Sequence, residues 1–350
     1  MTNRYEAATL RQFASQLLTA SGLPAERAEI VAEILVEGDL FGHDTHGLAL
    51  LGPYLNSIKQ GKMALSEEPD VITDRGATVV WDGLFLPGPW LVVKAIELAA
   101  ERLAEHGVVS VAIRRSHHIA CLQAYLKAAT DRGYLVLLMS SDPAIASVSP
   151  HGGLEAVYTP NPIAVGIPTE GAPILIDVSA STTTNGLTGR LHKEGGRLPG
   201  PWVKDNQGQA TDNPSVLFDD PPGTIMPLGG LDRGHKGFAL GLLVEVMTSA
   251  LAGYGRAEKP DRWGASVFVQ LIDPNAFGGL DAFTRESSFL AAACRAVRVP
   301  EGAPPVRLPG EGGLQRRTEQ LQNGVKLHSG IMQTLTQWAE DMKIAVPAPR

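Results

Sequence analysis

The sequence predicts an α/β fold with a small helical segment at the N-terminus and a further helix at the C-terminus. Apolar residues recur at helical spacing through the first 60 residues, strand-like and helical patterns alternate from about residue 76, and a last amphipathic pattern occupies 318–342. Strands that alternate with helices favour a layered α/β core. We expect a helical domain at 1–75, an α/β domain at 76–310, and a C-terminal helix within 311–350 that packs back on the core.

Three helices are predicted in the N-terminal segment. The first has Leu10, Leu17 and similar residues on one face and ends before Gly22. The second follows Pro24, and the third follows the polar stretch GHDTHG and ends before Gly61. Beyond them, strands are expected at 77–83, 108–113, 134–140, 173–179 and 265–273, and helices at 89–107, 116–133, 235–253, 282–297 and 318–342.

Composition limits the classes of partner. The chain has 350 residues, 44% of them hydrophobic and 19% charged, with a formal net charge of −7. Nucleic acids and anionic membranes attract basic surfaces, so we expect neither as a partner and a small molecule as the ligand. The N-terminus lacks the order of a secretory signal, no apolar run approaches the roughly 18 residues of a membrane span, and there are two cysteines. These features predict a cytoplasmic protein.

The stretch GHDTHG at 42–47 places two imidazoles and a carboxylate between two predicted helices. Histidine is the commonest general acid or base, and a helix start lowers the pKa of a histidine there. His46 is therefore the candidate acid/base, and Thr45 can cap the next helix or bond a substrate. A turn that is only structural explains the stretch equally well. A metal bound by His43 and His46 is a further alternative, but no other ligands stand nearby to complete a zinc site.

Three other segments are candidates for ligand binding. In RRSHHIA, Ser116 is expected to cap a helix that follows a strand, with His118 toward the crevice and His117 a surface residue. In GHKGFALGLL, Lys236 lies between glycines at a predicted helix start, where phosphate can bind. A third candidate is Glu311 in VRLPGEGG, because carboxylates often accept hydrogen bonds from ribose hydroxyls. The chain has no G-x-G-x-x-G fingerprint, so any dinucleotide binds without it.

Taken in order, these segments resemble the second-type malate/L-lactate dehydrogenase family. That family includes sulfolactate and ureidoglycolate dehydrogenases, diketogulonate reductase and Δ1-piperideine-2-carboxylate reductases. The resemblance runs from about residue 5 to 340. It rests on GHDTHG with Tyr54 after it, SHH, NPIAVGIP at 161–168, ILIDVSAS at 174–181, GHKGFAL, IDPNAF at 272–277 and VRLPGE at 306–311. It implies a mixed-sheet dehydrogenase fold that is not Rossmann, a homodimer, and NAD or NADP as cofactor.

The resemblance also assigns site residues. His46 matches the catalytic histidine, with Thr45 beside it, and His118 matches a histidine on the nicotinamide side; Leu50 and Tyr54 fall at substrate positions. The residues that match cofactor-binding segments are Ser140, Asp177, Val178, Ser179, Ala180, Ser181, Thr182, Thr183, His235, Lys236, Gly310, Glu311 and Gly312. No metal ligand is implied.

Departures from the family pattern affect the substrate. The family reads S-H-G-V-x-R, whereas this chain has Thr45 and Leu50 at the first and last positions. Thr45 keeps the hydroxyl, but Leu50 removes the guanidinium that would hold a substrate carboxylate. Either another cation binds the carboxylate, or the substrate lacks one there and is larger or more apolar. Ile119 and Ala120 replace the usual Phe-Gly.

We therefore expect hydride transfer between a nicotinamide and a 2-hydroxy/2-oxo acid or cyclic imino acid, with His46 as the acid/base. Two alternatives remain open at this point. One is a metal-dependent hydrolase that uses His43, His46 and a distal ligand. The other, suggested by Leu50, is a relative that has lost catalysis and kept ligand binding.

Overall fold

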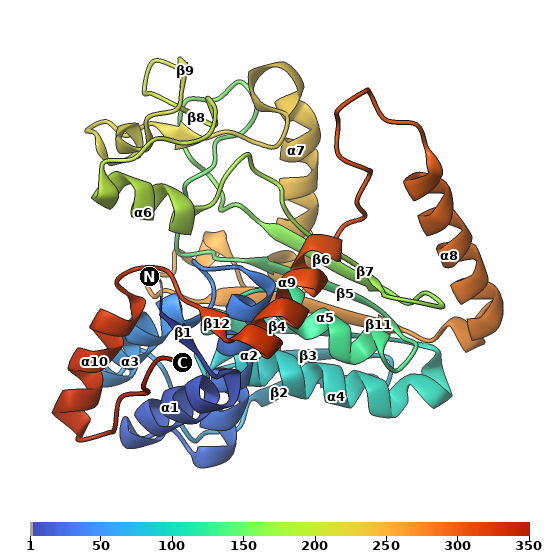
Figure 1. Cartoon of the computed structure of the whole chain (residues 1–350), viewed down its shortest axis with the longest axis horizontal. Helices are drawn as coiled ribbons and strands as arrows, with labels where there is room; N and C mark the ends of the chain where they lie inside the picture. The colour runs from blue at the N-terminus through green and yellow to red at the C-terminus, as the bar shows by residue number, and fades with distance from the viewer. Residues whose placement is uncertain (1–2) are drawn as a thin grey trace.

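A computed structural model describes residues 3–350; Met1 and Thr2, at the start of the predicted helical domain, lie outside the described residues. The N-terminal segment forms α1 (Ala7–Ala20), α2 (Ala25–Phe41), a short 3-10 turn (Leu48–Leu50) and α3 (Leu51–Lys59). These are the three helices that the spacing predicts. Their apolar faces, with Leu10, Leu17 and Leu35 fully buried, pack against one another beside the sheet (Figure 1).

A seven-stranded mixed sheet forms the centre of the molecule. Its strand order is β2-β3-β4-β11-β5-β6-β7, and β3 and β4 are its parallel pair. The strands are β2 (Asp70–Asp74), β3 (Thr78–Asp82), β4 (Val108–Ser116), β5 (Leu135–Ser141), β6 (Pro162–Ile167), β7 (Ile174–Ser179) and β11 (Ala265–Ile272). The mixed α/β fold expected from the sequence is confirmed.

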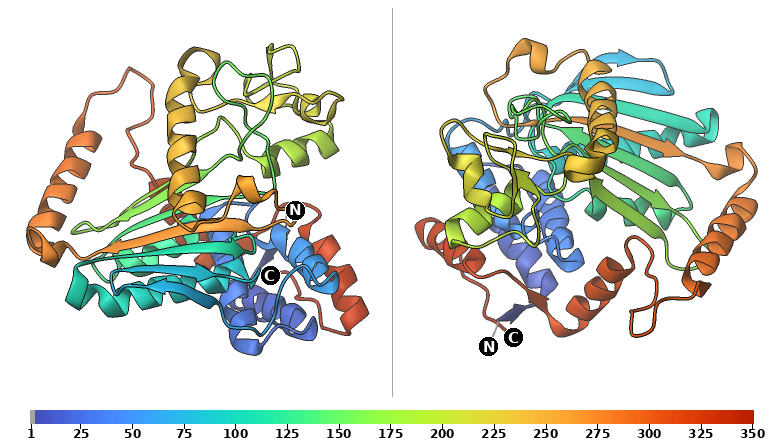
Figure 2. Two further views of the ribbon diagram at one scale, coloured as in Figure 1. Left: turned by 180° about the vertical axis from the view of Figure 1, so that it is seen from behind. Right: turned by 90° about the horizontal axis from the view of Figure 1, so that it is seen from above.

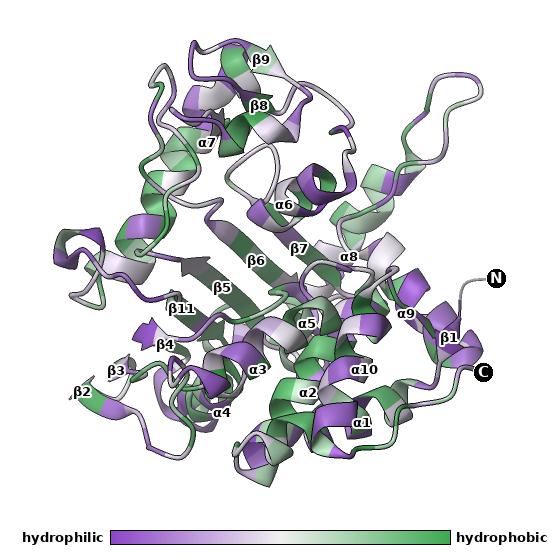
Figure 3. Cartoon of the chain, turned by 90° about the vertical axis from the view of Figure 1, so that its left-hand side faces the viewer, coloured by the Kyte–Doolittle hydropathy of each residue, from purple (hydrophilic) through white to green (hydrophobic). Residues whose placement is uncertain are grey.

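Helices cover both faces of the sheet because side chains of a strand alternate between the faces. In β4, Val109, Val111 and Ile113 are buried toward α4 (Gly88–His106) and α5 (Gln123–Thr130). Ala112 faces the other side, where it forms a second apolar cluster with Phe268 of β11 and Val244 of α7 (Gly230–Glu245), next to the π-helical turn that follows α7. Figure 3 shows the hydrophobic strands β5 to β7 between these layers.

A lobe of loops and short elements lies above the sheet on the α7 side (Figures 1 and 2). It contains α6 (Asn185–Glu194) and a small sheet of β8 (Val203–Lys204), β9 (Ala210–Thr211) and β10 (Thr224–Ile225). Val148, Tyr158 and Ile225 form its own apolar cluster. This is the region that is rich in glycine and proline, and it places α6 over the end of the sheet.

The C-terminal segment was predicted to form one helix, and this prediction is wrong. It forms α9 (Glu311–Asn323), β12 (Val325–Lys326) and α10 (Ile331–Met342). Gly324 and Gly330 have φ values of +89° and +88°, which interrupt a helix. The break lets β12 pair with β1 (Arg4–Tyr5), which brings the two termini together (Figure 2). α9 packs against α2, and α10 against α1 and α3.

Helix α8 (Leu280–Ala296) lies at the periphery of the molecule (Figure 1). Ala291 is its one buried residue among 17, whereas Phe289 and Leu290 are 72% and 61% exposed. Apolar side chains also remain exposed on α7, including Leu242 and Leu243. No helix among residues 3–350 combines the length and the apolar character that crossing a membrane requires.

Candidate active site

A cavity of about 720 Å³ lies where the N-terminal helices, the sheet and the lobe with α6 meet. This volume is in the range of cofactor and substrate sites. Its walls come from the segments 42–50, 118–122, 140–145, 159–162, 177–179, 184–190 and 263–265. The ends of β4 and β5 open into it, as expected for a ligand site in an α/β sheet.

Two close contacts with Asp39 of α2 fix the loop that carries His46. Asp39, buried near the end of α2, accepts a hydrogen bond from the backbone N–H of Leu48 at 2.7 Å. A Cβ at position 47 would lie 2.4 Å from the Asp39 carboxyl, so only glycine fits there. The loop therefore turns sharply at Gly47 and presents His46 to the cavity.

His46 is neutral at physiological pH. Its Nδ1 lies 2.8 Å from the Thr45 hydroxyl, which leaves Nε2 as the ring nitrogen for a ligand. Burial lowers the pKa of His46 to about 4, with a contribution from neighbouring His43 and a smaller opposing one from Asp44. Burial is thus the main cause of the low pKa that the sequence attributed to a helix start.

His118 faces His46 across the cavity, with 5.8 Å between the ring centroids. Its Nδ1 accepts a hydrogen bond from the backbone N–H of Ala120 at 3.2 Å, so the neutral ring carries its proton on Nε2. The hydroxyl of buried Tyr54 contacts the same Nδ1 at 3.0 Å and donates to the His118 carbonyl at 2.9 Å. Tyr54 thus supports His118 from behind and does not line the cavity.

Two expectations for the segment around His118 are wrong. Ser116 ends β4 and does not cap a helix, because residues 117–122 form a loop before α5 begins at Gln123. The Ser116 hydroxyl donates to the His117 carbonyl at 2.7 Å. His117 is fully buried instead of exposed, with its ring against Tyr54 and Trp263.

The predicted cofactor residues divide into two groups. Ser140, Asp177 and Ser179 line the cavity, whereas Val178 points to the other face of β7 and is 45% exposed. Ala180, Ser181, Thr182 and Thr183 lie just beyond the wall. The Thr182 hydroxyl donates to the carbonyl of Trp202 at 2.6 Å, which ties the lobe to the sheet.

The last two predicted segments lie away from the cavity. α7 begins at Gly230, so the expectation that Lys236 stands at a helix start is wrong; it lies in the second turn, and both His235 and Lys236 are exposed. Gly310 and Gly312 line a separate shallow depression. Glu311 accepts a hydrogen bond from the N–H of Leu308 at 2.8 Å and pairs with Arg295, so its carboxylate is engaged within the protein.

One group of possible metal ligands occurs among residues 3–350. His43, Cys121 and Asp177 place ligand atoms within 4.8 Å of one another, and His46 is not in the group. Gln123 already bonds two of them, through its side-chain oxygen to His43 at 2.6 Å and through its backbone N–H to Asp177 at 2.9 Å. The His43–His46 pair that the hydrolase alternative requires is therefore not supported.

Several lining residues were missed by the sequence reading. The ring of Trp263 lies beside that of His118, tilted by 31° and with 5.1 Å between the ring centroids, and Asp142, Asn161 and Arg190 add polar groups. Burial raises the pKa of Asp142 to about 6, and its Oδ2 is buried without a hydrogen-bond partner. An asparagine after a proline gives no signal, but Gly186 could have been noted as a point where the backbone approaches a neighbour closely.

Comparison with known proteins agrees with this geometry. The model of the malate/L-lactate dehydrogenase family matches residues 5–336. Hydroxycarboxylate dehydrogenase B of Escherichia coli K12 is 27% identical over 340 residues, which cover 95% of this chain and 92% of that protein. The structure of malate dehydrogenase from Pyrococcus horikoshii superposes with a TM-score of 0.88 at 25% identity, covering 99% and 97% of the two chains.

A third similarity extends the range of chemistry. The structure of Δ1-piperideine-2-carboxylate reductase from Pseudomonas syringae has a TM-score of 0.84 at 26% identity and covers 97% of this chain and all of that one. The fold and these relatives define the class of the protein, an oxidoreductase that transfers hydride with a nicotinamide cofactor. Within that class, the chain belongs to the malate/L-lactate dehydrogenase family.

Proposed function

We propose that the protein interconverts a 2-hydroxy and a 2-oxo acid, or reduces a cyclic imino acid, with His46 as the acid/base. The supporting observation is that His46 and His118 face each other in the cavity, with 5.8 Å between their ring centroids. The chain that carries this pair belongs to the malate/L-lactate dehydrogenase family. The relatives named above act, by their names, on hydroxycarboxylates, malate and an imino acid. All of these substrates carry a carboxylate beside the reacting carbon.

The proton transfer follows from the state of His46. In the oxidative direction, the neutral imidazole accepts the hydroxyl proton of the substrate at Nε2, and in reduction the protonated ring returns it. The Thr45 hydroxyl, 2.8 Å from Nδ1, orients the ring and stabilises whichever protonation state forms. His118, with its proton on Nε2, donates a hydrogen bond to the substrate oxygen or to the nicotinamide carboxamide.

The far end of the cavity is suited to the nicotinamide half of the cofactor, which supplies or accepts the hydride when bound. The unpartnered Oδ2 of Asp142 is an acceptor for a ribose hydroxyl or the carboxamide N–H. Ser140 and Ser179 offer hydroxyls on the same wall. We further propose that Asp177 to Thr183, His235, Lys236 and Gly310 to Gly312 contact the remainder of NAD or NADP; Glu311 would have to leave Arg295 to do so.

We propose that two copies of the chain associate through α7 and α8. Among the described residues, α7 exposes Leu242 and Leu243 and α8 exposes Phe289 and Leu290, and such exposed apolar side chains are typical of an interaction surface. A second copy of the chain can bury the exposed apolar side chains of α8, because in a twofold interface the same apolar helix of each copy packs against the other. A cytoplasmic location is also proposed, supported by two free cysteines, of which Cys121 is buried.

A turnover screen tests the proposed function. NADH and NADPH are each combined with pyruvate, oxaloacetate, phenylpyruvate and Δ1-piperideine-2-carboxylate, and absorbance of the reduced nicotinamide is followed. We expect turnover with at least one acceptor and a preference for one cofactor. Cofactor binding without turnover would indicate a relative that has lost catalysis. Metal that stays bound after washing with a chelator, with no oxidation of the reduced nicotinamide in any combination, would support the hydrolase alternative.

A further inference from the structure

The substrate cavity lacks the cation that the family pattern would place at position 50, and one other cation lines it. Leu50 lies in the cavity wall. Among the lining residues, all within 3–350, Arg190 is the one arginine or lysine. A 2-oxo acid carries a negative charge beside its reacting carbon, and a buried carboxylate without a cationic partner is costly. Arg190 is therefore the residue to consider as that partner.

The backbone brings Arg190 close to His46 through Gly186. A Cβ at position 186 would lie 3.2 Å from Thr45 Cβ and 3.5 Å from His46 Cε1, so the first turn of α6 packs directly against this pair. Residues four apart lie on the same face of a helix. Arg190 is thus on the face of α6 that contacts the acid/base, one turn of about 5.4 Å farther along.

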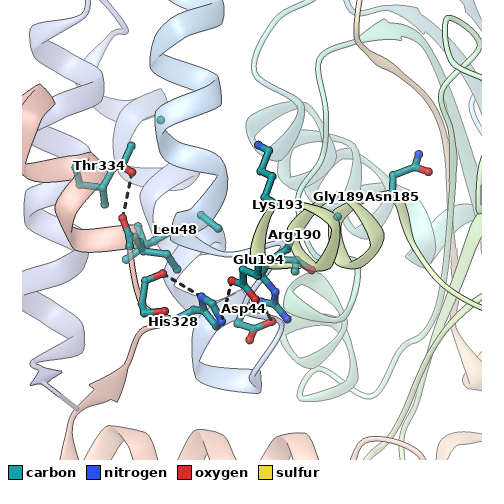
Figure 4. A pocket seen from close by; sticks show the side chains of 17 residues that line it. Asp44, Leu48, Asn185, Gly189, Arg190, Lys193, Glu194, His328 and Thr334 are labelled. Carbon is teal, nitrogen blue, oxygen red and sulfur yellow. Dashed lines mark hydrogen bonds and ion pairs between the residues drawn. The ribbon is translucent and has the colours of Figure 1, made fainter. Parts of the chain in front are cut away.

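The guanidinium of Arg190 has unused hydrogen-bonding capacity. Its Nη1 lies 3.0 Å from Asp44 Oδ1, and Figure 4 shows the side chain extending from α6 toward that carboxylate. Nε is buried without any partner, and Nη1 meets Asp44 at ion-pair distance without the geometry of a hydrogen bond. Asp44 balances part of the charge at Nη1, while the Nε–H group is left for an acceptor. An oxyanion is the ligand that satisfies buried guanidinium donors best.

We propose that Arg190 binds the carboxylate of the substrate and replaces the missing arginine at position 50; this inference rests on the function proposed above. In a 2-oxo acid, the carboxylate is attached to the carbon that bears the reacting oxygen. His46 can therefore bond that oxygen while Arg190, on α6, binds the carboxylate. The remainder of the substrate then lies against Leu50 and Trp263, which favour an aliphatic or aromatic substituent.

Neutral analogues separate this role from a general effect on the site. Arg190→Met is compared with the parent enzyme using pyruvate, phenylpyruvate and their methyl esters, which keep the reacting carbonyl and lose the charge. We expect kcat/KM to fall about a hundredfold or more for the acids and less than threefold for the esters. Arg190→Lys should recover part of the loss, since it keeps the charge but not the planar donors.

Lys193 supplies a matched control. It lies three residues farther along α6, lines the neighbouring cavity shown in Figure 4, and is not part of the substrate cavity. Lys193→Met should leave the ratio of acid to ester turnover unchanged. The dissociation constant of the reduced cofactor and the melting temperature are measured for every variant, so that loss of folding is seen directly.

Three results would overturn the inference, and they are distinguishable. Equal losses for acid and ester at unchanged cofactor affinity would make Arg190 a structural partner of Asp44. Weakened cofactor binding with an unchanged acid-to-ester ratio would assign its guanidinium to a cofactor phosphate. A parent enzyme that turns over none of the 2-oxo acids, their esters and Δ1-piperideine-2-carboxylate would remove the proposed function itself, and the inference with it.

Discussion

The environment of His46 makes the two directions of the reaction differ in their pH dependence. Because burial holds its pKa at about 4, the base form dominates at neutral pH and the acid form is scarce. We predict that kcat/KM for oxidation is constant from pH 6 to 9 and falls only as the pH approaches 4. For reduction it should fall about tenfold per pH unit above pH 5. An oxidation profile with its midpoint near 6.5 would contradict the lowered pKa.

Leu50 makes the cavity wall apolar at the position where the family pattern has an arginine. Leu50→Arg would add a second cation near the one on α6, so kcat/KM for oxaloacetate, with its two carboxylates, should rise at least tenfold relative to phenylpyruvate. Leu50→Met, which keeps an apolar side chain of similar size, is the control and should change the ratio little. Parent enzyme that already uses oxaloacetate as well as phenylpyruvate would count against an apolar wall.

Sequence patterns located individual site residues when these lay inside a compact motif. His46, Thr45, His118 and Leu50 all line the cavity, because the motifs GHDTHG and SHH sit directly at its edge. Trp263, Asp142 and Arg190 come from separate loops and α6, and no local spacing links them to His46. The exposure of His117 was predicted wrongly because burial behind a wall leaves no periodic signal. Tyr54 lies behind the wall, and its assignment as a substrate residue stays a prediction. Whether the lining residues act as assigned stays a prediction.

At the scale of elements, the end of α2 and the following loop depend on buried Asp39. Burial raises the pKa of Asp39 to about 7, whereas the N–H of Leu48 lowers it less. The folded protein therefore binds this proton more tightly than the unfolded chain, so the contribution of Asp39 to stability is largest below about pH 4 and is lost as the pH rises from about 4 to 7.

Asp39→Asn keeps an acceptor for the Leu48 N–H and cannot ionise. The difference in free energy of unfolding, Asp39→Asn minus parent, is measured at two pH values. We predict that this difference is more favourable to the variant at pH 8 than at pH 5.5 by roughly 2 kcal/mol. Urea unfolding at the two pH values measures this difference. Asp142 is also buried, so Asp142→Asn provides a comparison at the other end of the cavity. A difference for Asp39→Asn that is the same at both pH values would mean that Asp39 does not titrate in this range.

Elements were predicted well where apolar periodicity is strong and poorly where tertiary contacts interrupt it. α1, α4 and β11 follow their patterns closely. The region 318–342 reads as one amphipathic helix, yet pairing of β12 with β1 and two glycines with positive φ divide it. α7 starts five residues before the predicted position, because Gly229 and Gly230 form its entry and the sequence pattern of a helix begins only with the apolar residues after them.

At the scale of the whole molecule, the exposed apolar helices predict assembly. The parent protein should sediment as a dimer at micromolar concentration. Phe289→Glu, which places a charge on the more exposed of the two large apolar side chains of α8, should shift it toward the monomer, whereas Glu286→Gln on the same helix should not. Sedimentation equilibrium distinguishes these outcomes, and a monomeric parent protein would exclude the proposed interface.

The mixed sheet was implied by resemblance to the family, since spacing alone predicts alternating strands and helices without their order. The β11 strand, inserted between β4 and β5 from a distant part of the chain, has no local signature of its place. Division of the chain at residues 75 and 310 stays a prediction; β2, at Asp70–Asp74, already pairs with β3 in the sheet.

The role of His46 is the central claim, and steady-state kinetics of His46→Gln test it most directly. With the acceptor and cofactor identified by the turnover screen, kcat should fall by about 10²–10⁴, while the cofactor dissociation constant stays within twofold of the parent value. His106→Gln, at the far end of α4, should behave like the parent enzyme. A His46→Gln variant that keeps more than half of the parent kcat would contradict the assignment of His46 as the acid/base.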